Sequence, residues 1–324
     1  MRLPRSGPEL FQRIAERWRW FVYRVRFHPW TTNELPGILG TLGDYVRLTR
    51  LDRPVGIWLL LWPTLWAVWI AGRGKPDPRL FLLFVSGTVL MRSAGCAVND
   101  YADRSFDPHV ARTAGRPLAQ GRITTTEALI LFAVLALASL ALVLQMNKYT
   151  LLMAVVGAFL AVTYPFVKRF LSVPQLYLGA AFGWGIPMAF AAQLDHVPRV
   201  AWLFVIANML WVTVYDTMYA MVDREDDLKI GVRSTAILFG DSDRHILAVL
   251  QALTLLALYL AGRLLNMSGW YFAGLAAGAL CFIRQLWLIR NRDRDACFRA
   301  FLESHYFGMS VFIGILLTYQ FANP

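Results

Sequence analysis

The sequence predicts an all-α protein that crosses a membrane several times. Of its 324 residues, 57% are hydrophobic and only 16% are charged, which is too apolar for an ordinary soluble domain. The apolar residues gather in runs long enough to cross a bilayer as helices. We expect about nine membrane spans, at residues 57–72, 80–98, 126–146, 149–166, 175–194, 200–222, 246–262, 269–286 and 305–321.

The distribution of basic residues predicts the topology. A net charge of +11 would also suit a nucleic-acid-binding protein. However, 24 of the 32 Lys and Arg residues lie in the segments on one side of the expected bundle, and only 6 lie in the opposite loops. By the positive-inside rule, the N-terminus is cytoplasmic. The excess charge therefore reflects topology and attraction to anionic lipid, and we expect no nucleic-acid partner.

Residues 1–50 are expected to form a basic extension on the inner leaflet, ahead of a transmembrane domain over 51–324. An amphipathic pattern over 9–27 is typical of a helix lying in the membrane surface. A basic lead-in then reaches Pro54, which suits the first turn of the first span. Arg53 has two interpretations: a residue that snorkels to the membrane surface, or a clamp for a carboxylate or phosphate.

The end of the second span carries three carboxylates, at Asp100, Asp103 and Asp107. If one helix continues through them, their spacing places all three on one face. Acids on one face repel one another unless a cation lies between them. A hard divalent ion such as Mg²⁺, held by oxygen ligands, is the usual solution, and it can hold a phosphate-bearing substrate.

A second acidic stripe ends the sixth span. Asp216, Asp223 and Asp227 are spaced to share one helical face, with Tyr219 beside them. Each carboxylate inside a membrane costs roughly 2.5–3.5 kcal/mol, which favours a functional site over a solvated surface. Two stripes predict two metal ions and one diphosphate.

Basic residues follow both stripes. Arg104, Arg112 and Arg116 come after the first, and they can neutralise a leaving diphosphate or simply mark the cytoplasmic side. Lys168 fits the same two interpretations. It follows Pro165, which we expect to kink or end the fourth span.

Small residues and cysteines predict structural roles. Gly179 and Gly183 are four residues apart in the fifth span, a spacing suited to close helix packing. Cys96, Cys281 and Cys297 lack the spacing of a metal site, and we expect free thiols rather than disulfides.

The two acidic motifs resemble those of the UbiA superfamily of intramembrane prenyltransferases. The first is Asn99-Asp100-x-x-Asp103-x-x-x-Asp107, and the second is Asp216-x-x-x-Tyr219-Ala220-x-x-Asp223-x-x-x-Asp227. Residues 51–64, 91–100 and 215–223 are also similar to proteobacterial 4-hydroxybenzoate polyprenyltransferases. The resemblance covers roughly 45–322 and leaves 1–40 outside.

The resemblance implies nine transmembrane helices around a central cavity that opens to lipid. It implies metal ligands for two Mg²⁺ ions at Asn99, Asp100, Asp103, Asp107, Asp223 and Asp227. It implies diphosphate contacts from Arg104, Arg116, Lys168, Tyr164 and Tyr219. Arg53 would bind an aromatic carboxylate, and Asp216 would act as a base or stabilise an allylic cation. Arg233 stands where family members often have Lys, so the charge is kept.

The implied reaction is Mg²⁺-dependent transfer of a polyprenyl group from polyprenyl diphosphate to 4-hydroxybenzoate, at the ring carbon ortho to the hydroxyl, in ubiquinone biosynthesis. The implied location is the bacterial inner membrane, with the site facing the cytoplasm. Association with other quinone-pathway enzymes is a further expectation. Either Asp216 or the diphosphate takes the ring proton.

Two kinds of alternative stay open. Within the same fold, the acceptor could be a naphthoate, homogentisate, haem or a glycerophosphate. A transporter would also use acids within the membrane. The acids here lie at helix ends beside cations, which favours the enzyme, and a purely structural scaffold leaves the paired stripes unexplained. Prenyl chain length and oligomeric state do not follow from the sequence.

Overall fold

The structure is a computed structural model that describes residues 38–110, 112–167, 171, 173–230 and 234–322. All regular secondary structure in this part of the chain is helical. The chain divides into two units, Met1–Tyr45 and Val46–Pro324. The amphipathic helix expected over 9–27 lies outside the described residues. The expected boundary near residue 50 stays a prediction.

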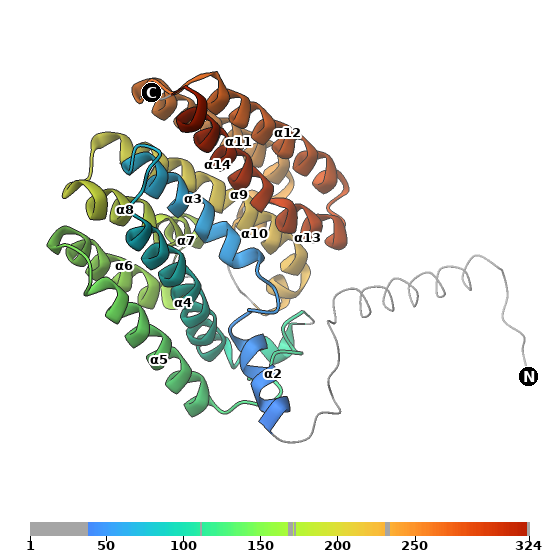
Figure 1. Cartoon of the computed structure of the whole chain (residues 1–324). Helices are drawn as coiled ribbons and strands as arrows, with labels where there is room; N and C mark the ends of the chain where they lie inside the picture. The colour runs from blue at the N-terminus through green and yellow to red at the C-terminus, as the bar shows by residue number, and fades with distance from the viewer. Residues whose placement is uncertain (1–37, 111, 168–170, 172, 231–233, 323–324) are drawn as a thin grey trace, which may run out of the picture. The chain divides into compact units, whose positions relative to one another are not determined.

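The described helices follow one another along the chain, with a long connection between α4 and α5 (Figure 1). The α-helices are α2 (Ile38–Leu48), α3 (Val55–Ala71), α4 (Pro78–Asp103), α5 (Thr125–Val143), α6 (Lys148–Val167), α7 (Pro174–Gly183), α8 (Gly185–Leu194), α9 (Arg199–Ile230), α10 (Thr235–Phe239), α11 (Asp243–Leu264), α12 (Gly269–Leu288), α13 (Arg294–Glu303) and α14 (His305–Phe321). Three short 3₁₀ turns are η1 (Asp107–His109), η2 (Gly240–Ser242) and η3 (Ile289–Asn291).

Each expected span coincides with a helix or, for 175–194, with the pair α7 and α8. Seven helical segments in the described residues are long and apolar enough to cross a membrane, and α3 is an apolar helix of shorter length. The all-α membrane fold is therefore confirmed. The count of nine spans and the side on which the N-terminus lies stay predictions.

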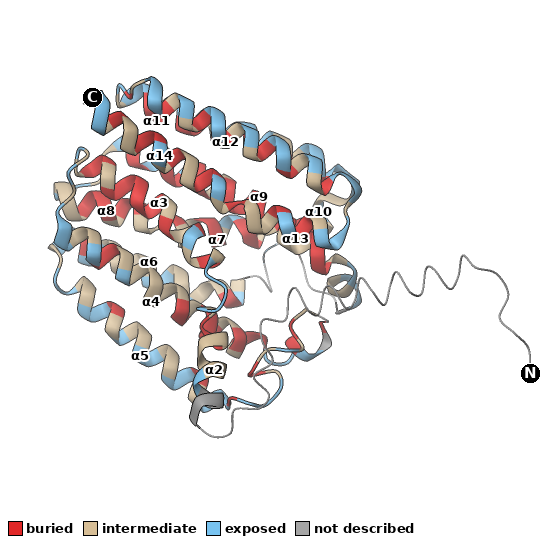
Figure 2. Ribbon diagram, turned by 45° about the vertical axis from the view of Figure 1, so that its right-hand side comes forward, coloured by how far each residue is buried: buried red, intermediate tan, exposed pale blue. Residues whose placement is uncertain are grey.

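Helix α9 lies at the centre of the packing. It contacts α7, α11 and α13, while α3 packs against α8 and α14. Trp66 of α3 stacks on Trp211 of α9 at 5.8 Å between ring centroids, and its indole N–H donates to the Gly308 carbonyl. Figure 2 shows buried residues concentrated in these inner helices and exposed ones along α5 and α12. Exposed apolar surface on outer helices is what contact with lipid requires.

The fifth expected span is broken at Trp184. Its indole N–H donates to the Met153 carbonyl of α6 at 2.7 Å, which fixes the break between α7 and α8. On α7, a Cβ added to Gly179 would lie 2.7 Å from the backbone of Met209, and one on Gly183 would lie 2.6 Å from the amide of Asn208. Both glycines therefore allow close approach to α9, and their predicted packing role is confirmed.

The structure also places Pro165 and the three cysteines. Helix α6 continues through Pro165 and ends two residues later, at Val167. Cys96, Cys281 and Cys297 are free thiols, as predicted.

Candidate active site

The first acidic stripe lies on two elements rather than one. Helix α4 ends at Asp103, and Asp107 begins the separate turn η1. The condition for a shared helical face, one helix through all three acids, is therefore not met. Pro108 explains the change, because a proline disfavours helical backbone at the residue before it and has no N–H for a helical hydrogen bond.

Arginines nevertheless join the acids of this stripe. Arg50 directs Nη2 at both carboxylate oxygens of Asp100, at 2.7 and 2.9 Å. Arg116 Nη1 lies 2.7 Å from Asp107 Oδ2 and 3.0 Å from Asp100 Oδ1, so it bridges α4 and η1. Asn99 donates its amide to Asp103 Oδ2 at 3.2 Å. Burial raises the pKa of the Asp107 carboxyl, against the opposing effect of Arg116.

The second stripe lies on one unbroken helix, as predicted, because α9 runs from Arg199 to Ile230. Arg112 holds Asp223 with Nε 3.0 Å from both oxygens and Nη2 2.5 Å from Oδ2. Its Nη1 donates to the Tyr219 hydroxyl, and its guanidinium lies 4.3 Å from the centroid of that ring. Arg112 thus binds two residues of the second stripe, Tyr219 and Asp223, which lie one helical turn apart.

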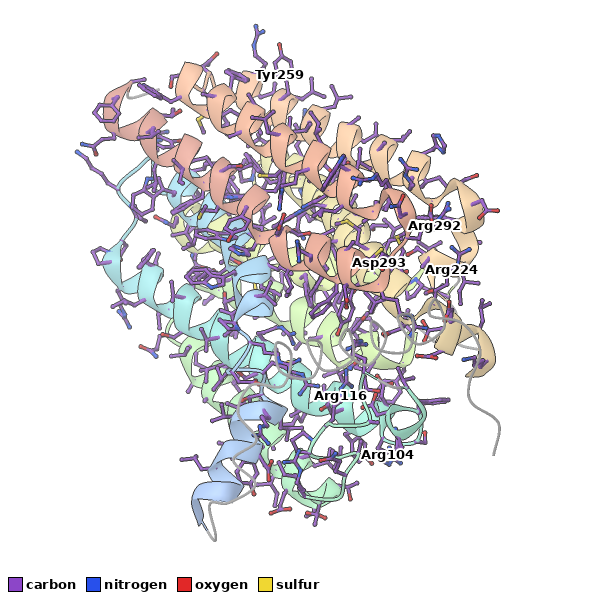
Figure 3. The ribbon with its side chains drawn as sticks, turned by 90° about the vertical axis from the view of Figure 1, so that its right-hand side faces the viewer. Arg104, Arg116, Arg224, Tyr259, Arg292 and Asp293 are labelled. Atoms are coloured by element: carbon purple, nitrogen blue, oxygen red, sulfur yellow. The ribbon has the colours of Figure 1, made fainter. Side chains whose placement is uncertain are left out.

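The segment after α4 connects the two stripes. Arg112 and Arg116 are four residues apart on it, and they bind the second and the first stripe respectively. Figure 3 shows Arg116 on this segment and, farther along the same side of the molecule, Arg224 of α9 close to Arg292. The fold therefore brings the two stripes to one site, although they are more than a hundred residues apart in sequence.

A group of polar side chains continues from the acids into the membrane domain. The charged and polar groups that act electrostatically on Tyr164 of α6 are Asp216, Asp103, Arg92 and Tyr219, from α4 and α9. Asp216 and Arg92 also act on Tyr215. The predicted positions Tyr164, Asp216 and Tyr219 are therefore close enough to influence one another electrostatically.

Arg92 is the residue of this region to which the sequence interpretation gave no role. It lies on α4 seven residues before Asn99, and its Nε is buried without a hydrogen-bond partner. Its Nη1 donates to Cys96 Sγ. A Cβ on Gly56 of α3 would lie 2.5 Å from Arg92 Nε, so Gly56 makes room for the guanidinium. An arginine inside an apolar run was the signal that could have found it.

Among the described residues, other predicted residues are seen in contacts that do not involve the pairs formed by Arg50, Arg112 and Arg116. Arg53 is about half exposed, with its Nε 3.7 Å from Asp52 Oδ2. Arg104 is exposed and donates to the Tyr101 carbonyl at 2.8 Å. Asp227 lies on α9, one turn after Asp223. Lys168 and Arg233 lie outside the described residues. The roles of all these residues stay predictions.

Ion pairs also fix the end of α9 that carries the second stripe. Asp243 at the start of α11 is fully buried and binds Arg292 through two contacts of 2.8 Å. Arg224 of α9 lies 3.5 Å from the same carboxylate, and Arg294 of α13 lies 2.7 Å from Glu225. These contacts hold α9 against α11 and α13 directly beside Asp223.

The ligand atoms of the site fit a hard divalent cation. Asn99 and the aspartates of both stripes offer oxygen atoms only, which suits Mg²⁺. Three of the carboxylates already bind guanidinium groups, so they are arranged to hold positive charge. Within the described residues, no three acidic, His or Cys side chains form a ready metal cage. Mg²⁺ does not need one, because it commonly binds through one or two carboxylates plus substrate phosphates.

Comparison with known protein families gives one match over most of the chain. The model of the UbiA prenyltransferase family matches residues 60–313.

Relatives from proteobacteria match at high identity. A 4-hydroxybenzoate octaprenyltransferase from Aeromonas salmonicida is 57% identical over 275 residues, covering 85% of this chain and 95% of the relative. Proteins of the same name from Methylococcus capsulatus and Nitrosococcus oceani are 57% and 58% identical. These two alignments cover 86% and 85% of this chain, and 96% of each relative.

Solved structures share the fold. The apo structure of a UbiA homologue from Aeropyrum pernix K1 has a TM-score of 0.71 at 25% identity, covering 81% of this chain and 97% of that one. A UbiA homologue from Archaeoglobus fulgidus, bound to GPP and Mg²⁺, has a TM-score of 0.62 at 18% identity and covers 84% of this chain and 99% of its own.

Proposed function

This chain belongs to the UbiA prenyltransferase family, and from that premise we propose how its site performs the family's chemistry. It is an aromatic prenyltransferase that moves a polyprenyl group from polyprenyl diphosphate to 4-hydroxybenzoate, in ubiquinone biosynthesis, as the names of its relatives at 54–58% identity support. The new bond forms at the ring carbon ortho to the hydroxyl. It is a multi-pass membrane protein, in our proposal of the bacterial inner membrane, with the acidic site at the cytoplasmic face. Association with other quinone-pathway enzymes stays a prediction.

One observation carries the proposal for the site. Arg112 and Arg116, from a single connecting segment, bind carboxylates of both stripes. A diphosphate needs this combination, because its oxygens bind both guanidinium groups and carboxylate-held metal ions.

We assign Mg²⁺ to the oxygen atoms of Asn99 and of the aspartates in both stripes, with one ion for each stripe. The support is the oxygen-only donor set described above, together with the Archaeoglobus fulgidus homologue, which is bound to GPP and Mg²⁺. When bound, Mg²⁺ neutralises charge that develops on the departing diphosphate.

The arginines change partners as the substrate binds. In the structure, Arg112 and Arg116 neutralise Asp223, Asp107 and Asp100. With Mg²⁺ bound to these carboxylates, Arg112 and Arg116 would be able to bind the diphosphate oxygens instead. The same arginines then stabilise the leaving group as the C–O bond ionises.

The inner polar region receives the aromatic acceptor. Arg92 is the candidate for its carboxylate, because its Nε is buried and lacks a partner, and a guanidinium matches a carboxylate in two-point geometry. Arg53, the earlier candidate, is half exposed beside Asp52. Asp216, near Tyr164 and Tyr215, is placed to stabilise the allylic cation or take the ring proton. The surrounding apolar helices exclude water from the cation.

The deciding experiment is a transfer assay with purified protein in detergent. The mixture holds labelled 4-hydroxybenzoate, a long polyprenyl diphosphate and Mg²⁺, with a chelator as control. We expect label to enter the organic phase only when Mg²⁺ is present. Transfer to a naphthoate or homogentisate but not to 4-hydroxybenzoate would contradict the assigned acceptor. Folded protein that transfers to no acceptor, but moves an ion into vesicles, would support a transporter.

A further inference from the structure

A cavity lies at the end of the bundle opposite the acidic stripes. It has a volume of about 300 Å³ and lies where the turn after α3 meets the last turns of α14. Helix α4 starts beside this turn and ends at the acidic stripe, so the length of the membrane domain separates the two sites. The residues that line it include Trp69, Arg73, Lys75, Leu316, Tyr319 and Gln320.

The lining of this cavity has a cationic part and an apolar part. Arg73 and Lys75 come from the turn and are both exposed, while Trp69 and Leu316 come from the membrane helices α3 and α14. Tyr319 and Gln320 add a hydroxyl and an amide at the level where α14 ends. A ligand that matches both parts has an anionic head and an apolar body.

Arg73 has a backbone conformation that its side chain makes unfavourable. Its φ is +48°, in the left-handed region that residues with a Cβ rarely adopt. Glycine takes this conformation without cost, and glycines flank Arg73 on both sides. An arginine at this position therefore indicates that its side chain makes an interaction that offsets the backbone cost.

Two other arginines with the same conformation show what that interaction can be. Arg50, at φ +59°, binds buried Asp100, and Arg292, at φ +54°, binds buried Asp243. Arg73 has no ion-pair or hydrogen-bond partner for its guanidinium among the described residues, and Lys75 has none either. The positive-inside rule also disfavours cations in this loop. Both side chains are therefore available to an anion from outside the chain.

We propose that this cavity binds the headgroup of an anionic phospholipid from the leaflet opposite the acidic site. The phosphate lies against Arg73 and Lys75, because a guanidinium fork and an ammonium both suit phosphate oxygens. The glycerol and acyl carbons lie along Trp69 and Leu316. Free phosphate shares the charge but leaves the apolar part of the cavity uncovered.

The test measures lipid-dependent thermal stability of the full chain in detergent. A ligand that binds only the folded protein raises the melting temperature with its concentration. We expect phosphatidylglycerol to raise the melting temperature of the wild-type protein, and phosphatidylcholine or inorganic phosphate at equal ionic strength to have little effect. Titration gives an apparent dissociation constant for each lipid.

Variants then connect the effect to the cavity. Arg73→Gln should weaken phosphatidylglycerol binding about fivefold, and adding Lys75→Gln should bring the loss to about thirtyfold, since each cation contributes similarly near a membrane surface. Arg73→Gly is more telling. It should leave the melting temperature without lipid unchanged or higher, because glycine suits the left-handed turn, yet it should weaken phosphatidylglycerol binding at least as much as Arg73→Gln. Arg263→Gln, which changes an exposed cation in the last turn of α11 on the same side, is the matched control and should respond like wild type.

Three results would overturn the proposal. One is a wild-type protein that does not respond to phosphatidylglycerol. Another is an equal loss of response in Arg263→Gln, which would indicate general surface charge. The third is the same response to inorganic phosphate alone, which would leave no role for a lipid.

Discussion

The two acidic stripes bear the same kind of residue but are built differently. The second lies on one unbroken helix, α9, and Arg112 binds its Asp223. The first is divided between the end of α4 and the turn η1, and Arg50 and Arg116 hold it together. A continuous helix places its acids by periodicity alone, whereas a divided stripe depends on residues from other segments.

The two stripes therefore differ in what sets the positions of their acids. The geometry of the second stripe follows from local spacing. The geometry of the first follows from a proline, a loop and arginines from before and after α4. If both stripes serve one diphosphate, however, losing either should have the same consequence for the reaction.

The largest expected effect comes from removing one acid in each stripe. Asp103→Ala and Asp223→Ala should each reduce transfer of labelled 4-hydroxybenzoate at least about a hundredfold, because loss of metal-mediated charge stabilisation costs several kcal/mol in the transition state. Thermal unfolding controls for correct folding. A folded variant of either position with normal turnover would break the proposed equivalence of the stripes.

A substitution of Asp216 tests whether the second stripe takes part in the chemical step as well as in metal binding. Asp216→Asn should lower kcat about a hundredfold or more, as expected for loss of a general base or a cation-stabilising charge. Mg²⁺ affinity, measured by calorimetry with an inert diphosphate, should stay close to that of the wild type. Unchanged kcat would remove Asp216 from the mechanism and leave proton removal to the diphosphate.

Arg92 and Arg53 form a matched pair of arginines for the aromatic carboxylate. Arg92→Gln should raise the KM for 4-hydroxybenzoate by roughly ten- to a hundredfold, since a charged hydrogen-bond partner is worth about 1.5–3 kcal/mol. Arg53→Gln should change it little. The reverse result would return the carboxylate to Arg53 and make Arg92 structural.

Changing Arg112 should give the smallest effect, but it should change the affinities for diphosphate and for Mg²⁺ in opposite directions. Arg112→Gln should weaken binding of inorganic diphosphate about tenfold, because one charged contact is lost. The same variant should bind Mg²⁺ alone more tightly, because Asp223 no longer has a competing cation.

The control for Arg112 is Arg122→Gln, an exposed arginine of the same connecting segment that donates to the Gly115 carbonyl. By calorimetry, this control should bind inorganic diphosphate and Mg²⁺ with the affinities of the wild-type protein. If Arg112→Gln weakened the binding of both diphosphate and Mg²⁺, the proposal that Arg112 exchanges Asp223 for the diphosphate would be wrong. The transfer reaction itself could still be intact.

The sequence alone determined the membrane class, the helical positions and the two acidic motifs. These features are local: apolar runs report spans, and spacing along one helix reports a shared face. Asp216, Asp223 and Asp227 are thus on one helix as predicted. The motifs around Asn99 and Tyr219 also identified the family, which the matches over residues 60–313 bear out.

Only the tertiary structure decided which cations meet which acids. Arg50 lies fifty residues before Asp100, and Arg112 lies more than a hundred residues before Asp223, so no periodicity relates them. The buried Nε of Arg92, inside the second span, distinguished it from the half-exposed Arg53 ahead of the first span. The physical reason is that ion pairs and burial depend on contacts between distant segments, and the packing of α4, α9 and the loops around them creates those contacts.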